Sequence, residues 1–211
     1  AAAGKLEGSF IDVEQFLALG SLIDGNSLVL RKNNPTTVLQ ALRGAIGRCL
    51  AINAKDGMCL GLDVRADWVA ADWEVQNKRA GLPVLTSALA KARNATKQAP
   101  TFPDAWQILA ETYFRISNAP GQSLAVQLQH VVNGLAAAEK TFAINPNHAW
   151  GHATRGSLLL RQAQLVKDPD AKRTLAQSAV GAFERAIQNE RFLSKDYAAA
   201  LAQAKALLAS Q

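Results

Sequence analysis

Few residues of this 211-residue chain have the type and spacing that chemistry requires. His148 and His152 are four residues apart at an expected helix start, where two imidazoles on one face could bind a metal ion. They lack a His-Glu-x-x-His motif, and no cysteine or carboxylate is near them in the sequence. We therefore expect these histidines to pack and to cap a helix, and we predict no metal site and no cofactor.

The carboxylates Asp67, Asp72 and Glu74 share one expected helix, but their spacings of five and two residues do not bring them together. Acid–base catalysis needs carboxylates that converge in a pocket. We expect a solvated helix face instead. The chain also lacks a glycine-rich phosphate loop, the His-Arg-Asp and Asp-Phe-Gly sequences of kinases, and a Gly-x-Ser-x-Gly elbow. We therefore predict that the chain is not an enzyme.

The composition indicates a folded, moderately basic protein. Hydrophobic residues make up 49% and aromatic residues 6%, while the net charge is +6. Lys and Arg dominate residues 31–55 and 78–97. Such clusters favour acidic partners weakly, and a basic helical module that binds nucleic acid remains the alternative function.

The sequence also gives expectations about the compartment. No apolar run is long enough to span a bilayer, so we expect no membrane segment. The two cysteines, Cys49 and Cys59, do not form a disulfide framework, and we expect small buried thiols. Free thiols fit a reducing compartment, and we predict a cytoplasmic location.

A repeated stop divides the chain. The string Ala-Ile-Asn occurs at residues 51–53 and 143–145, an offset of 92 residues, or twice 46. A similar stop, Gln98-Ala99-Pro100, lies midway. A constant period of this length is typical of stacked structural repeats.

Each unit contains two helical patterns. In the clearest unit, Trp106, Leu109, Ala110 and Tyr113 form one apolar face at three- and four-residue spacing.

This pattern resembles the tetratricopeptide repeat (TPR) family. The resemblance rests on Trp106, Leu109, Ala110 and Tyr113, then Gly134, Ala138, Thr141 and Pro146. It implies an all-α fold: a right-handed superhelical array of antiparallel helix pairs, an α-solenoid of about nine helices. The period of 46 residues exceeds the family's usual 34. It also implies a non-catalytic scaffold that binds a protein or peptide; the sequence does not identify this partner or the oligomeric state.

A second resemblance is to the long-helix variants that follow the catalytic domain in bacterial eukaryotic-like serine/threonine protein kinases. Residues 158–163, 167–170 and 182–187 carry it. It implies the regulatory or partner-binding region of such a kinase.

The periodicity predicts these elements. We expect a linker over residues 1–8, a divergent helix pair over 9–56, TPR-like repeats over 57–193 and a capping helix over 194–211. The expected helices span 9–24, 36–52, 57–78, 82–98, 103–117, 121–144, 147–166, 170–189 and 194–208. Residues 25–35 are expected to form a loop or a short strand.

The first helix of each pair lines the concave surface of such an array. This register predicts a partner-binding groove formed by Arg65, Trp68, Gln107, Glu111, Phe114, Arg115, Trp150, Ser157 and Arg161. The alternative for Trp68 and Trp150 is simple packing. The Lys, Asn and Arg side chains with which some TPR proteins hold a carboxylate are absent from the corresponding positions, so that activity is not expected.

Overall fold

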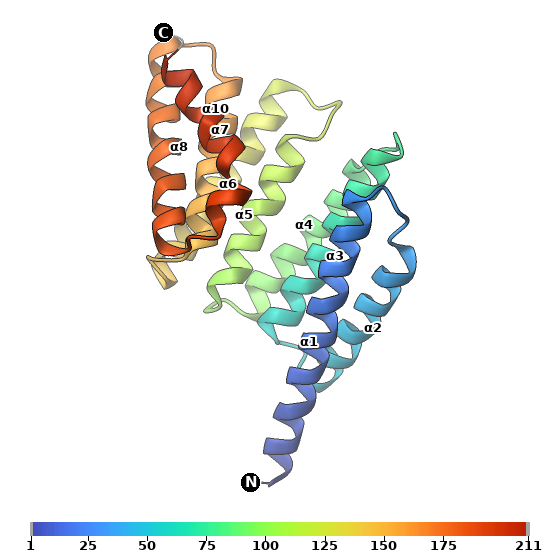
Figure 1. The fold of residues 1–211 in the computed structure, drawn as a ribbon. Helices are drawn as coiled ribbons and strands as arrows, with labels where there is room; N and C mark the ends of the chain where they lie inside the picture. Colours follow the sequence, from blue (N-terminus) through green and yellow to red (C-terminus); the bar gives the residue numbers. More distant parts are fainter. Residues whose placement is uncertain (1, 210–211) are drawn as a thin grey trace. The chain divides into compact units, whose positions relative to one another are not determined.

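The computed structural model describes residues 2–209, with side chains from Phe10 onward. Within this range the chain is helical and contains no strand (Figure 1). No helix of the described part combines the length and the apolar character needed to span a bilayer. The elements are α1 (Ala2–Leu30), α2 (Thr36–Ile52), α3 (Gly57–Gln76), α4 (Leu82–Gln98), α5 (Pro103–Ser117), α6 (Leu124–Ile144), α7 (Ala149–Leu165), α8 (Pro169–Asn189), α9 (Leu193–Asp196) and α10 (Ala198–Ala209).

The helices pack in two compact units, Ala1–Ile108 and Leu109–Gln211. In unit 1, α1 packs on α2 and α3 on α4, and α3 also packs against α1 and α2. In unit 2, α7 packs against both α6 and α8, and α10 lies mainly on α8. The predicted all-α class, built from consecutive packed helix pairs, is confirmed within each unit.

The 46-residue period is visible in the helix ends. The helices α2, α4 and α6 end at Ile52, Gln98 and Ile144, each 46 residues after the last. The residue after each helix, Asn53, Ala99 or Asn145, leaves the helical conformation with ψ of 97°, 62° and 96°. These positions include the recurring asparagine of the sequence.

The asparagine closes the turn between repeats. Asn53 Oδ1 accepts a hydrogen bond from the Lys55 N–H, and Asn145 Oδ1 accepts one from the Asn147 N–H, each at 3.1 Å. Such turns let a short side chain replace a backbone acceptor. The next helix, α3 or α7, starts four residues after the asparagine, so the asparagine fixes where these two repeats begin.

One position in each repeat allows two helices to approach closely. Cys49, Ala95, Thr141 and Ala186 occupy it, and all four are fully buried. The backbone carbonyl of each accepts the N–H that ends its helix. The facing position, ten residues later, is also small in the first three repeats: Cys59, Ala105 and Gly151. A Cβ on Gly151 would approach Thr141 Cγ2 to 3.0 Å, so this crossing excludes larger side chains.

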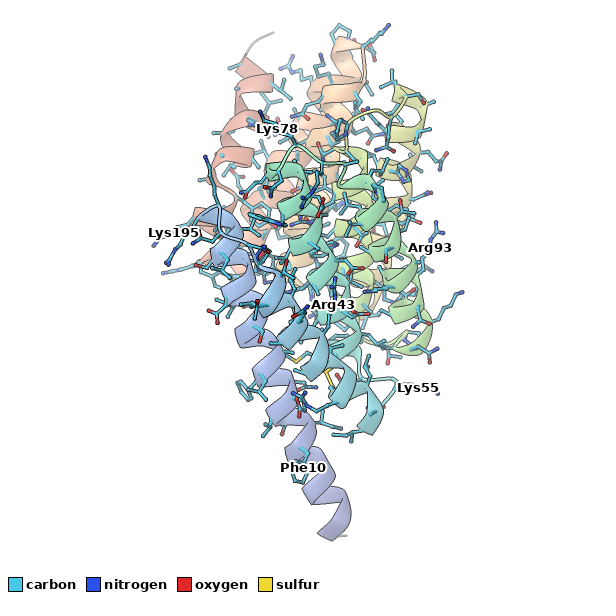
Figure 2. All side chains as sticks on the ribbon, turned by 90° about the vertical axis from the view of Figure 1, so that its right-hand side faces the viewer. Phe10, Arg43, Lys55, Lys78, Arg93 and Lys195 are labelled. Carbon is cyan, nitrogen blue, oxygen red and sulfur yellow. A yellow bond between two sulfur atoms is a disulfide. The ribbon has the colours of Figure 1, made fainter. Side chains whose placement is uncertain are left out.

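The expectation of free thiols is wrong. Cys49 and Cys59 form a disulfide that joins the end of α2 to the start of α3, visible as the yellow bond in Figure 2. Both cysteines are fully buried. Two cysteines are too few for a framework of several bridges, but the repeat register places these two positions face to face. The argument for a reducing compartment therefore fails.

The N-terminal helix is longer than predicted. Residues 2–8, expected to be linker, belong to α1, and residues 25–30, expected to be loop or strand, continue it. The helix persists because Val29 is buried in the same core as Leu22, and the Asn26 side chain donates a hydrogen bond to the Leu22 carbonyl. It ends at Leu30, two residues before Lys32, whose φ of 59° is left-handed.

The C-terminal segment differs in one detail. The single helix expected at 194–208 is divided into α9 and α10 at Tyr197, which raises the described helices from nine to ten. The expected apolar stripe is confirmed, since Tyr197, Leu201, Ala204 and Leu208 pack with residues of α7 and α8.

Two glycines provide a matched test of the tight packing in unit 2. A Cβ on Gly156 of α7 would lie 2.8 Å from the ring of Phe183, which is fully buried, whereas a Cβ on Gly181 of α8 would meet nothing within 4 Å. Gly181→Ala should stabilise the protein by about 0.5–1 kcal/mol through helix propensity. Gly156→Ala should destabilise it by about 1–2 kcal/mol through overpacking. Denaturant unfolding measures both; equal effects would contradict the packing.

The disulfide can be tested by replacing it with the next repeat's own residues. Cys49→Ala/Cys59→Ala recreates the Ala95/Ala105 pair, so the fold should persist while stability falls by about 3 kcal/mol, the contribution expected for a loop of this length. Because the two sulfurs are bonded to each other, a thiol reagent should detect no free cysteine in the native wild-type protein or after denaturation without reductant. Two titratable thiols in denaturant would show that the bond is absent.

Candidate functional site

The histidine pair has structural partners. His148 caps α7, since its Nδ1 accepts a hydrogen bond of 3.0 Å from the Gly151 N–H. His152 Nε2 lies 2.9 Å from the Pro146 carbonyl oxygen, and its ring stacks on Phe142 at 4.4 Å. The predicted capping and packing roles are confirmed.

Of the described residues, those grouped closely enough to share a metal ion are Cys49, Asp56 and Cys59. Because the disulfide engages both sulfurs, the Asp56 carboxylate is the one metal ligand that remains in this group.

Of the acidic residues that we expected on a solvated face of α3, Asp72 is exposed but Asp67 is not. Asp67 is only 3% exposed and is held by three side chains from neighbouring helices. Its carboxylate lies 3.1 Å from Arg43 of α2 and 3.0 Å from Lys91 of α4, and it accepts a hydrogen bond of 3.2 Å from Ser87. Asp67 therefore ties together α2, α3 and α4. The sequence showed the carboxylate but not its two cations, each of which is 24 residues away along the chain.

Ion pairs engage several cations of the two basic segments, residues 31–55 and 78–97. Arg43 and Lys91 are engaged by Asp67, while Arg48 pairs with Glu14 at 2.8 Å and Arg79 pairs with Glu74. In Figure 2 the other labelled cations of unit 1, Lys55, Lys78 and Arg93, lie at separate points rather than in one stripe. A basic face that tracks a phosphate backbone needs clustered, available cations. The pairing in unit 1 therefore does not favour the nucleic-acid alternative.

The predicted groove residues of unit 1 divide into buried and surface-facing sets. Trp68 is 8% exposed and Gln107 is 3% exposed, so both are core residues. The burial of Trp68 agrees with the alternative prediction, that this side chain packs in the core. Arg65 lines a hollow of about 190 Å³ with Met58 and Asp104. Its other walls are apolar: Leu19, Leu62, Phe102 and Ile108, with Gly57 and Gly61.

In unit 2, three predicted groove residues are engaged with their neighbours. Glu111 pairs with Arg115 at 3.4 Å and accepts a hydrogen bond of 3.3 Å from Thr154, which is on α7. Trp150 lies with its ring 6.0 Å from Phe192 and 6.2 Å from Tyr197, at the C-terminal segment. These contacts hold α5 to α7 and α7 to the segment around α9.

The remaining three predicted residues, Phe114, Ser157 and Arg161, line one hollow of about 140 Å³ in unit 2. We call it the Arg161 pocket. Its walls come from three helices or their ends: Phe114 and Asn118 from α5, Ser157, Leu160, Arg161 and Gln164 from α7, and Ala200 and Gln203 from α10. The helical register thus brought together the residues of α5 and α7.

Arg161 gives the pocket its chemistry. The guanidinium donates hydrogen bonds from one terminal nitrogen to the Ser117 carbonyl at 3.0 Å and to Gln127 Oε1 at 2.9 Å. Its buried Nε has no hydrogen-bond partner among the described residues. Burial lowers the pKa of Arg161 from its ordinary value, and no described carboxylate pairs with it. The amides of Asn118, Gln164 and Gln203 complete a polar rim without an acidic residue.

The sequence analysis missed Asn118, Gln164, Ala200 and Gln203. Asn118 and Gln164 follow directly from the register, because they lie four and three residues after Phe114 and Arg161. The two residues of α10 had no such signal. The apolar stripe showed that the last helix packs on the chain, but not that its polar edge borders α7.

No family model matches the chain, and no curated protein matches it. A solved structure of a thermophilic TPR protein from Thermus thermophilus is similar over 87% of this chain and 98% of that one, with 17% identity and a TM-score of 0.46. This similarity is too loose to establish a family or a ligand.

The environment of His152 predicts a pH dependence of stability. Burial lowers the pKa of His152 from its ordinary value, against the opposing effect of the Pro146 carbonyl; Arg185, Arg155 and His148 lower it further. The stabilisation is therefore present above the unfolded pKa of about 6.5 and is lost as the pH falls through the lower folded value. We expect the free energy of unfolding to drop as the pH falls below about 6.5, and to drop less in His152→Gln. Parallel pH profiles for the two proteins would contradict this.

Proposed function

We propose that this chain is a non-catalytic helical-repeat module that binds a protein or peptide, and that the Arg161 pocket contacts the ligand. The observation that carries the proposal is the pocket itself: a cation without a carboxylate partner, an amide-rich rim and an apolar floor. The repeated helix pairs support a scaffold role, since such units present surfaces for partners. The catalytic motifs missing from the sequence agree with this role.

The chemistry of the pocket indicates an extended peptide that offers a carboxylate or an amide. A desolvated guanidinium forms strong, charge-assisted hydrogen bonds with a carboxylate. Asn118, Gln164 and Gln203 can each donate to or accept from a backbone amide. Phe114, Leu160 and Ala200 provide apolar contact for an adjacent aliphatic side chain. A volume of about 140 Å³ suits one side chain of a peptide rather than a whole small-molecule cofactor.

The cellular context is a further part of the proposal. The resemblance of residues 158–163, 167–170 and 182–187 to kinase-associated repeats supports a place beside a bacterial serine/threonine kinase domain. Within the second of these segments, Asp168 caps α8 by accepting a hydrogen bond from the Ala171 N–H. The cytoplasmic location predicted from free thiols loses its basis. A buried disulfide supports an oxidising compartment, so we propose that the repeats act outside the cytoplasm.

Peptide selection against the purified protein tests the pocket. Peptides enriched from a random display library should share an acidic or amide-bearing residue. Gln203→Glu places a carboxylate at the rim, where it should compete for Arg161 and weaken such peptides at least tenfold, or about 1.4 kcal/mol. Isothermal titration calorimetry measures the change.

The matched control is Gln177→Glu, which makes the same change on the exposed surface of α8 away from the pocket. It should leave peptide affinity unchanged. Equal losses in both variants would show a general charge effect, and no loss in either would place the ligand elsewhere.

A further inference from the structure

A polar hollow of about 230 Å³ lies in unit 1, where α1 and α3 end. Lys32, Trp73, Gln76 and Asn77 line it. Lys32 follows the end of α1, and the other three residues belong to the last turn of α3 and the residue after it. The hollow shares no residue with the Arg161 pocket, which belongs to unit 2.

Lys32 has a backbone conformation that lysine rarely adopts. Of the described residues other than glycine, those with a positive φ are Lys32 at 59° and Lys78 at 58°. Each comes two residues after a helix, where glycine is the usual residue because it has no Cβ to strain this conformation. A lysine in this conformation indicates that its side chain is needed there. The two lysines differ in one respect, since Lys32 lines the hollow and Lys78 does not.

The polar groups of the hollow are available to a ligand. Within the described part of the chain, the Lys32 ammonium and the Gln76 amide have no ion-pair or hydrogen-bond partner. The Asn77 amide donates to a backbone carbonyl of α3 at 2.8 Å, which leaves its side-chain oxygen as an acceptor. The acidic residue beside this segment, Glu74, is bound by Arg79 at 2.9 Å, so it does not neutralise Lys32.

Trp73 provides the apolar wall of the hollow. Its side chain is partly buried and packs against the core of unit 1, so the indole is held in place. A fixed aromatic face, two amides and one cation suit a ring with an apolar C–H face, several hydroxyl groups and one carboxylate. A uronic acid, which is an acidic sugar, has this combination of groups. A volume of about 230 Å³ has room for one such ring.

We propose that this hollow binds a uronic acid unit of an acidic saccharide. The indole of Trp73 packs on the C–H face of the sugar, and the Lys32 ammonium binds its carboxylate. Gln76 and Asn77 form hydrogen bonds with its hydroxyl groups. A mononucleotide could also stack on the indole. A single lysine without an arginine fork suits one carboxylate better than a doubly charged phosphate, so the saccharide is favoured.

Isothermal titration calorimetry of the full 211-residue chain tests the class of ligand. The probes are trisaccharides of galacturonic, glucuronic and mannuronic acid, their methyl esters, and adenosine monophosphate. At least one uronate should bind, and its methyl ester, which has the same rings without the charge, should bind about tenfold more weakly. Equal binding of acid and ester, binding of the nucleotide alone, or binding of no uronate overturns the proposal.

Two matched substitutions test the role of Lys32. Lys32→Gly removes the cation and suits the positive φ, so the unfolding midpoint should hold or rise while uronate affinity falls about tenfold. Lys78→Gly makes the same change after α3, outside the hollow, and should leave uronate affinity unchanged. Full affinity of Lys32→Gly, or equal losses in the two variants, overturns the assignment.

Discussion

The close crossing of two helices at each repeat junction is the constraint on which the rest of the structure depends. Helix axes approach closely only where both side chains are small. In this chain Ala95 faces Ala105, and Thr141 faces Gly151, all of them buried. The turn that leads into the next helix pair is short and is fixed by the backbone carbonyls of Ala95 and Thr141. A larger residue at this point would move the next helix and every residue that it positions.

The disulfide is the same contact made covalent. Cys49 and Cys59 occupy the positions of Ala95 and Ala105, and their bond replaces a van der Waals contact without a change in the turn. It secures the first junction, where the sequence matches the repeat pattern least well. The ion pairs of Asp67 add a second restraint in the same unit, because they join α3 to α2 and α4. The described part of unit 2 has no disulfide and relies on packing at Gly156, Phe183 and Leu158.

Much of the fold could be predicted from the sequence because its signals are local. The stops at Asn53, Pro100 and Pro146 gave the ends of α2, α4 and α6 to the residue. Long-range pairings could not be predicted in this way. The partners of Asp67, the bond between Cys49 and Cys59, and the border that α10 forms beside α7 all join residues whose proximity follows only from packing. The candidate site shows the same division: the register grouped Phe114, Ser157 and Arg161, but it also included Trp68 and Gln107, which are buried.

The most direct test of the account is the stability of Ala95→Leu. The added atoms would enter the crossing with Ala105, where both residues are fully buried. The account predicts a loss of about 1–3 kcal/mol in denaturant unfolding, because an overpacked crossing cannot relax without a shift of the next helix. Unfolding at the wild-type midpoint, with unchanged cooperativity, would contradict the claim that small residues at the repeat junction set the positions of the helices.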